Sequence, residues 1–359
     1  MRASRRTGRR FAITALAGAA GAFVGWAIQH RFVAQANAAI SDADSEGLLM
    51  PADALHHWIS VDDGGRIHVV DKGEGPALVL LHGVLLSSSI WVHQFEDLTR
   101  NHRVIAIDLR GHGQSLPGRD GFGLPDNEGA IHTRAAKWPG IQRIAADVRQ
   151  VLDSLEVRDA VVVGHSMGGM VSLEMVRSMP PEELAERISA LILVDTTAGP
   201  VVSLPGWHKF ASATAPLSSR GLLAADRLGA RHLATRDLRW WSARFGFGAE
   251  APPTQVRFVE ALIGATPSST FAALTPSLAA FDVSRELDSR APRSLVIVGS
   301  HDHLTPVRQS RRLVETLPVA ELVELPRCGH MPMLERRHEF SRLLAEFSDK
   351  VGDGAVRDG

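Results

Sequence analysis

The chain of 359 residues has a single cysteine, no tyrosine and almost no net charge. The one cysteine, Cys328, excludes an intrachain disulfide and a cysteine-rich zinc site. Lys plus Arg number 39 against 40 Asp plus Glu, so the formal charge of −1 provides no general positive field for a phosphate backbone, and we expect no nucleic-acid partner. Hydrophobic residues make up 45% and charged residues 22%, which is typical of a globular chain with a sizeable core.

The amino terminus has the pattern of a targeting segment. Five arginines lie within residues 1–10, and residues 11–28 carry no charge. This apolar run is short for a membrane-spanning helix, which needs about 20 residues. The run Ala36-Asn37-Ala38 fits a cleavage site. We therefore expect residues 1–40 to be a signal peptide or a membrane anchor, with the rest of the chain outside the cytoplasm. The alternative is a cytosolic protein in which the run is a buried helix.

From residue 52 onward, short apolar runs alternate with segments of helical period. The apolar runs lie at 77–81, 103–107, 160–163, 190–194, 294–298 and 320–325. They are hydrophobic on both faces, which is typical of buried parallel strands. The helical segments lie at 141–156, 167–178, 306–316 and 336–348. The alternation predicts an α/β fold with a mostly parallel central sheet and helices on both faces.

One interval is far longer than the loops of 2–6 residues that are usual in α/β units. About a hundred residues separate the strand ending at Val194 from the next, near Ser294. We expect a helical insertion at 196–289 between a first core part, 52–195, and a second, 290–349. The last residues, 350–359, are expected to be a disordered tail.

Residues 160–170, AVVVGHSMGGM, carry the most informative motif. A buried strand runs through Gly164-His165-Ser166-Met167-Gly168 directly into a helix, which is the context that a G-x-S-x-G nucleophile turn requires. Glycine is needed where the backbone approaches its neighbours closely, and a helix amino terminus favours developing negative charge. Ser166 is therefore the candidate nucleophile.

A serine hydroxyl needs a base, and the base needs an orienting carboxylate. Asp302 follows one apolar strand and His330 follows the last strand, so both should lie at the sheet edge that carries Ser166. Asp195, directly after another strand, is the rival acid. His301 and His303 flank Asp302, but alternating loop residues diverge and no third ligand is apparent, so we expect no metal and no cofactor.

These motifs resemble those of the α/β-hydrolase superfamily, over nearly all of residues 55–348. The resemblance adds His82-Gly83 after a strand, similar to the oxyanion loop of esterases and lipases, and the turn Asp108–Ser115. It implies an oxyanion hole formed by the N–H groups of Val84 and Met167, a structural role for His82, and a helical cap at the insertion. Some members of the superfamily carry the acid at the position of Asp195.

The function expected on these grounds is that of a serine hydrolase. It would cleave carboxylic esters of apolar acyl groups through an acyl-enzyme, acting on a small-molecule ester or a lipid. Trp207, Trp240 and Trp241 of the insertion are expected to line the substrate cleft. The alternatives are lactone or carbon–carbon bond hydrolysis, perhydrolysis, acyl transfer, or a binding module without turnover.

Overall fold

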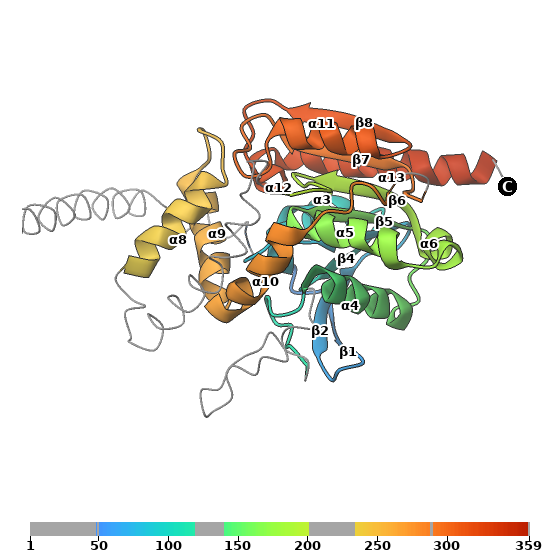
Figure 1. Ribbon diagram of the computed structural model, residues 1–359, viewed down its shortest axis with the longest axis horizontal. Coiled ribbons are helices and arrows are strands. Elements are labelled where there is room, and N and C mark those ends of the chain that lie inside the picture. Colours follow the sequence, from blue (N-terminus) through green and yellow to red (C-terminus); the bar gives the residue numbers. More distant parts are fainter. Residues whose placement is uncertain (1–47, 49, 119–139, 201–233, 288–289, 358–359) are drawn as a thin grey trace, which may run out of the picture.

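The computed structural model of the protein describes residues 48, 50–118, 140–200, 234–287 and 290–357 (Figure 1). Within these residues the chain forms an eight-stranded sheet in the order β1-β2-β4-β3-β5-β6-β7-β8. The strands are β1 (Leu55–Ser60), β2 (Arg66–Lys72), β3 (Ala77–Leu81), β4 (Arg103–Ile107), β5 (Ala160–His165), β6 (Ile188–Val194), β7 (Ser294–Gly299) and β8 (Ala320–Leu325). Each apolar run of the sequence is thus a strand.

The sheet is mostly parallel, as predicted. Only β1 and β2 run antiparallel to their neighbours, and the strands from β4 to β8 are all parallel. From β3 the chain moves to β4 on one side and then returns to place β5 on the other side. The carboxyl ends of β3 and β5 therefore border a topological switch point, where open α/β sheets leave a crevice.

Helices cover both faces of the sheet, as the alternating pattern predicted. One face packs against α4 (Gly140–Ser154), α5 (Met167–Ser178), α6 (Pro181–Arg187) and α11 (Val307–Thr316). The other packs against α3 (Val92–Leu98), the short α12 (Pro332–Glu335) and α13 (Arg337–Arg357), next to a 3-10 turn at Ser88–Trp91.

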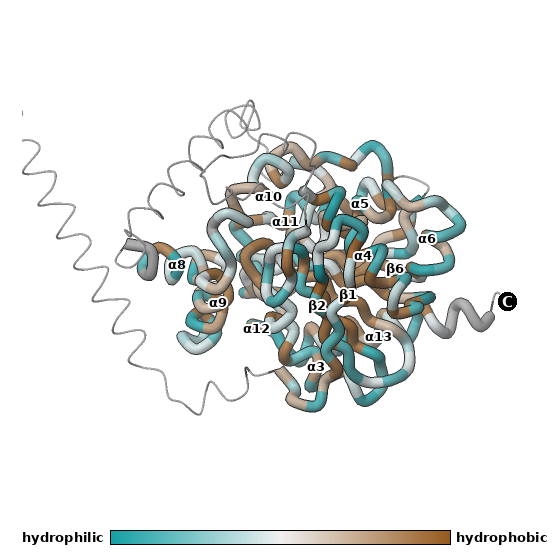
Figure 2. Tube along the Cα trace, turned by 90° about the horizontal axis from the view of Figure 1, so that it is seen from below, coloured by the Kyte–Doolittle hydropathy of each residue, from teal (hydrophilic) through white to brown (hydrophobic). Residues whose placement is uncertain are grey.

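The hydrophobic core forms two layers because successive strand residues point to opposite faces. In β3, Val79 and Leu81 belong to the first layer, whereas Leu78 and Leu80 belong to the second, and all four are fully buried. In Figure 2 the hydrophobic segments of the trace gather between the surrounding helices. The apolar runs of the sequence are therefore explained by burial on both faces.

The described part of the insertion is helical. It contains α8 (Ala234–Phe245), α9 (Pro253–Ala265) and α10 (Ser268–Ala280) between β6 and β7. In Figure 1, α8 and α9 lie beside one end of the sheet, and α10 lies next to α4. Ser277 Oγ of α10 accepts the N–H of Ile141 at 3.1 Å, which ties α10 to the first turn of α4. Trp207 lies outside the described residues.

The carboxyl terminus differs from expectation, because α13 continues to Arg357 instead of giving way to a disordered tail at residue 350. The physical reason is that no proline interrupts this stretch and Val351 packs against the second core layer. The proposed targeting segment, residues 1–40, lies outside the described residues. Among the helices that the structure describes, none is long and apolar enough to cross a membrane.

Candidate active site

Ser166 lies between β5 and α5 in a strained turn. Its φ of 52° is in the left-handed region that side chains other than glycine rarely adopt. A Cβ atom at Gly168 would lie 2.1 Å from the carbonyl oxygen of Leu81, and one at Gly164 would lie 2.6 Å from the carbonyl oxygen of Gly168. Only glycine fits at these two positions, so the spacing of the motif follows from close backbone approach.

The loop after β3 lies against this turn. A Cβ atom at Gly83 would be 3.2 Å from Ser166 Cβ, which puts the backbone of the loop beside the serine. Val84 follows Gly83, and Met167 is the first residue of α5, so the Met167 N–H has no acceptor within its own helix. The expected oxyanion donors are therefore on two chain segments that meet at the switch point, next to Ser166.

His82 holds the loop after β3 through both nitrogens of its ring. Nδ1 lies 2.7 Å from the carbonyl oxygen of Gly83, and Nε2 accepts the N–H of Leu109 at 2.9 Å. These partners require a neutral ring with its proton on Nδ1. Burial lowers the pKa of His82, which favours the same form. The expected role of His82 as an anchor of this loop fits the contacts.

His330 and Asp302 form a buried pair. His330 Nδ1 lies 2.8 Å from Asp302 Oδ2, and Asp302 Oδ1 accepts the N–H groups of Leu304 and Thr305 at 2.7 and 3.1 Å. Burial by itself would raise the pKa of Asp302. The charge of His330 and the hydrogen bonds from His330 and Thr305 outweigh this effect and lower that pKa well below its usual range. Asp302 is therefore a carboxylate that holds the imidazole.

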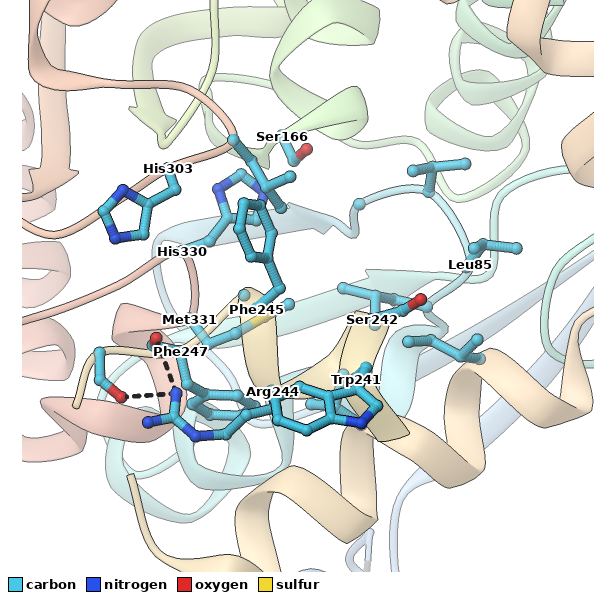
Figure 3. A pocket seen from close by; sticks show the side chains of 18 of the residues that line it. Leu85, Ser166, Trp241, Ser242, Arg244, Phe245, Phe247, His303, His330 and Met331 are labelled. Carbon is cyan, nitrogen blue, oxygen red and sulfur yellow. Dashed lines mark hydrogen bonds between the residues drawn. The ribbon is translucent and has the colours of Figure 1, made fainter. Parts of the chain in front are cut away.

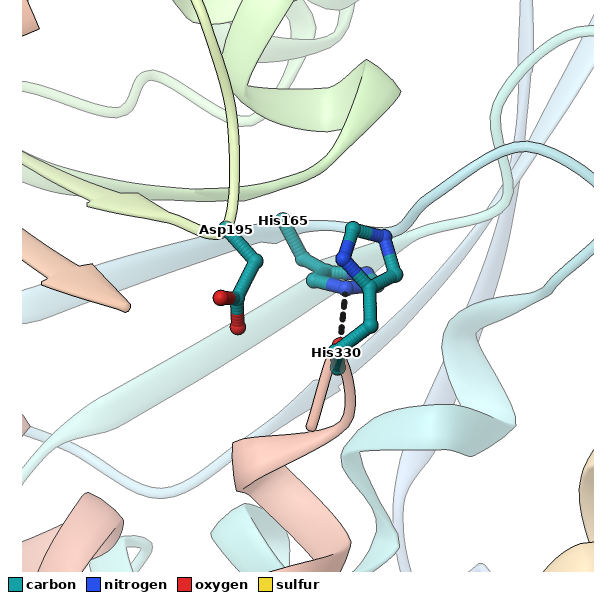
Figure 4. A group of neighbouring side chains, drawn as sticks. All are labelled: His165, Asp195 and His330. Atoms are coloured by element: carbon teal, nitrogen blue, oxygen red, sulfur yellow. Dashed lines mark hydrogen bonds between the residues drawn. The ribbon is translucent and has the colours of Figure 1, made fainter. Parts of the chain in front are cut away.

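Asp195, the rival acid, is also buried close to His330 (Figure 4). Its Oδ1 accepts the N–H of Gly299 at 2.9 Å, whereas its Oδ2 has no hydrogen-bond partner in the described structure. Burial and the charge of Asp302 raise the pKa of Asp195 well above its usual range. The structure therefore pairs the histidine with Asp302, whereas burial and the charge of Asp302 outweigh the Gly299 hydrogen bond and favour the neutral form of Asp195.

His165, next to the nucleophile, packs against the candidate base. Its Nε2 donates to the carbonyl oxygen of His330 at 2.8 Å, and the centres of the two rings are 4.7 Å apart (Figure 4). Burial, followed by the charge of His330, lowers the pKa of His165 well below its usual value. His165 is therefore a neutral donor that fixes the backbone of the His330 turn.

A cavity of about 980 Å³ lies in front of Ser166 and His330 (Figure 3). Val84, Trp240 and Trp241, which the sequence placed at the site, line it. Apolar side chains that the sequence analysis did not assign also line it: Leu85, Leu86, Phe245, Phe247, Val259, Ile263, Phe271, Leu304 and Met331. Trp240 is 4% exposed and Trp241 is 42% exposed, so the former belongs to the wall and the latter to the mouth.

In the part of the chain that the structure describes, His301 and His303 belong to no group of three side chains with close metal-ligating atoms. Among the described residues, the only three His, Cys, Asp or Glu side chains with suitably close ligand atoms are those of His165, Asp195 and His330. His165 Nε2 and His330 Nδ1 already bond to the His330 carbonyl and to Asp302. The geometry of this cluster therefore suits proton transfer and hydrogen bonding.

Glu335 and Thr305 also contact the His330 turn or its acid, and the sequence analysis did not find them. Thr305 Oγ1 donates to Asp302 Oδ2 at 2.6 Å, and Glu335 accepts the N–H groups of Gly329 and Met331. Thr305 could have been noticed because it follows Asp302 by three residues, as in a side-chain turn. Glu335 gave no such signal, since its nitrogen donors are backbone groups and its one side-chain partner is the distant Cys328 Sγ at 3.8 Å.

Comparison with known proteins agrees with this architecture. The profile described as "Alpha/beta hydrolase family" matches residues 78–343, and the chain belongs to that family. It is 25% identical over 296 residues to the AB hydrolase superfamily protein YisY of Bacillus subtilis (strain 168), with 82% of this chain and 100% of the relative covered.

Two further relatives carry more specific names. The chain is 26% identical over 303 residues to a 2-hydroxy-6-oxo-6-phenylhexa-2,4-dienoate hydrolase of Burkholderia cepacia, with 81% of this chain and 95% of the relative covered. An esterase from Exiguobacterium antarcticum shares the fold with a TM-score of 0.68 at 20% identity, with 82% of this chain and 100% of the esterase covered. The chain is thus a hydrolase by family, and its relatives differ in substrate.

Proposed function

We propose that the protein is a serine hydrolase that cleaves carboxylic esters of apolar acyl groups. Ser166 Oγ attacks the ester carbonyl, and His330 accepts the serine proton and then donates it to the leaving alcohol. Asp302 holds the imidazole and stabilises its charged form. The N–H groups of Val84 and Met167 stabilise the tetrahedral oxyanion, to which one such donor typically contributes about 3 kcal/mol. Water then hydrolyses the acyl-enzyme by the reverse proton transfers.

The observation that carries this proposal is the His330–Asp302 pair at 2.8 Å, at the cavity that Ser166 also lines. The strained backbone of Ser166 adds to it, because such strain persists only where the surrounding structure enforces it. The apolar cavity wall supports the choice of acyl group, since an apolar chain gains free energy there and a charged one does not.

The experiment compares the wild type with Ser166→Ala. We expect hydrolysis of p-nitrophenyl esters to fall by several orders of magnitude while the circular dichroism spectrum and the unfolding temperature stay near those of the wild type. A fluorophosphonate probe should label the wild type at Ser166 and leave the variant unlabelled. Ser172→Ala is the matched control, because Ser172 bonds the carbonyl oxygen of Gly168 inside α5 and does not line the cavity.

Two results would count against the proposal. Labelling that persists in Ser166→Ala would remove Ser166 as the nucleophile. Labelling of Ser166 without turnover of any ester in a panel from acetate to decanoate would exclude ester cleavage. It would favour another serine-dependent reaction, as the dienoate hydrolase among the relatives suggests.

A further inference from the structure

Glu335, at the end of the short helix α12, accepts backbone hydrogen bonds from two separate parts of the chain. Its Oε2 accepts the N–H of Gly248, in the loop between α8 and α9 of the insertion, at 2.8 Å. Its Oε1 accepts the N–H groups of Gly329 and Met331, on either side of His330, at 3.0 and 3.3 Å. One carboxylate thus joins the insertion to the turn that carries the candidate base.

The two segments touch along their backbones as well. The N–H of His330 donates to the carbonyl oxygen of Gly246 at 2.7 Å. A Cβ atom at Gly329 would lie 2.4 Å from the backbone nitrogen of Gly248. The loop itself is held by Arg244, whose guanidinium donates to the carbonyl oxygens of Phe247 and Gly248 at 3.2 and 3.0 Å. The loop 246–249 and the His330 turn therefore form one packed unit.

The carboxylate form of Glu335 is essential to this arrangement. Both oxygens act as acceptors, and a carboxylate offers acceptor sites on each, whereas an amide offers them on one only. Burial raises the pKa of Glu335 above its usual value, and the hydrogen bonds from the three N–H groups and from Cys328 Sγ reduce that rise by favouring the charged form. The N–H groups of the insertion loop and of the His330 turn thus share the same negative charge.

We propose that Glu335 is a positioning residue that fixes the His330 turn to the insertion loop 246–249 and thereby sets the direction of the imidazole toward Ser166. This proposal rests on the proposed function, since it assigns His330 the role of base. Phe247 of this loop and Phe245, the residue just before it, line the substrate cavity. One side chain, Glu335, therefore connects the cavity wall that contacts the substrate to the backbone turn that carries His330.

The test replaces Glu335 by glutamine, which keeps the shape and removes one acceptor oxygen. The variant must lose either the bond to Gly248 or the bonds to Gly329 and Met331, because an amide NH₂ then faces an N–H donor. We expect kcat for p-nitrophenyl acetate, per active site titrated with a fluorophosphonate, to fall by about 10- to 100-fold. KM for this short ester should stay nearly unchanged, since its acyl group makes few contacts with the cavity.

A second measurement needs no substrate. The proton between His330 Nδ1 and Asp302 should give a far-downfield NMR signal, identified by its loss in Asp302→Asn. We expect this signal to shift or broaden in Glu335→Gln and to stay unchanged in Glu346→Gln. Glu346 is an exposed carboxylate of α13 that pairs with Arg342 at 3.6 Å and is the matched control. Gly248→Ala disturbs the same link from the other side, because its Cβ would lie 2.7 Å from the carbonyl oxygen of Arg327 and 2.9 Å from Glu335 Oε2.

The proposal would be overturned if Glu335→Gln had the kcat per active site of the wild type. It would also be overturned by a lower kcat with an unchanged NMR signal, because that combination indicates a structural role only. If Glu335→Gln does not fold, Gly248→Ala decides by the same two measurements. If the wild-type protein hydrolyses no ester, the proposed function is wrong. The NMR comparison would then still show whether Glu335 positions His330.

Discussion

At the scale of single residues, Asp195 and Asp302 show how two carboxyl groups at neighbouring strand ends acquire different chemistry. Asp302 receives hydrogen bonds from His330, Leu304 and Thr305, and these favour its charged form. Asp195 receives one backbone hydrogen bond and faces the charge of Asp302. Because like charges in a buried site raise each other's pKa, ionised Asp302 favours a protonated Asp195.

This difference leads to a prediction about activity. Asp302→Asn should lower kcat for esters on the order of 10⁴-fold, because an amide cannot stabilise the charged imidazole or hold its correct tautomer. Asp195→Asn should change kcat only slightly, since an amide resembles the protonated acid in shape and can still accept the Gly299 N–H. Steady-state kinetics on purified variants measures both. Equal losses, or a larger loss for Asp195→Asn, would contradict the assignment of the acid.

The sequence left the choice between these two acids to a resemblance. Asp195 follows β6 directly and Asp302 lies in the loop just after β7, so the pattern of apolar runs places both at the same edge of the sheet. The two acids differ in the number of hydrogen-bond donors around each carboxylate. Backbone donors such as the Leu304 N–H cannot be inferred from residue types. Glu335 was missed for the same reason, because every nitrogen that donates to it belongs to the backbone.

At the scale of elements, the turn between β5 and α5 depends on how closely two chain segments approach. A Cβ atom at Gly168 would meet the carbonyl oxygen of Leu81, the last residue of β3. α5 can therefore begin directly over β3 only if this position lacks a side chain. The strand-to-helix geometry thus fixes both the residue type and the place of the candidate nucleophile.

We predict opposite effects for two glycine-to-alanine changes. Gly168→Ala should lower the free energy of unfolding by at least about 1–3 kcal/mol and abolish activity, because a backbone atom lies 2.1 Å from the new Cβ. Gly352→Ala, in α13 with no atom within 4 Å of its Cβ, should raise the free energy of unfolding by about 0.5–1 kcal/mol. Urea denaturation measures both. A stable, active Gly168→Ala would mean that β3 and α5 are farther apart.

The strands β3 to β8 were predictable because each is an apolar run, and β3 to β7 are buried on both faces. The helices between them were predictable from their helical period. The order of the strands in the sheet could not be predicted from periodicity. Periodicity indicates which residues are buried, but it carries no information about which strands pair with each other. The end of α13 was misjudged, since a polar sequence with two glycines indicates a tail unless the contact of Val351 with the core is known.

At the scale of the whole molecule, the cavity lies where the insertion meets the strand ends. Its mouth carries apolar side chains that remain accessible, with Phe245 55% exposed and Leu304 40% exposed. The aromatic content of the insertion predicted an apolar roof, and Trp240 and Trp241 do line the cavity. The contribution of Phe245 and Leu304 was not predictable, since it depends on how α8 is oriented over the loop after β7.

A substrate series tests whether this cavity selects apolar chains. Each methylene buried against its wall should contribute about 0.8 kcal/mol, so kcat/KM for p-nitrophenyl esters should rise about fourfold per methylene until the cavity is filled. Phe245→Ala should flatten this rise, because it removes an apolar group from the mouth. Trp58→Ala is the matched control: Trp58 is 45% exposed on β1 and does not line the cavity, so its removal should leave the rise unchanged. A flat series from acetate to octanoate in the wild type would show that the apolar wall serves packing of the insertion rather than choice of substrate.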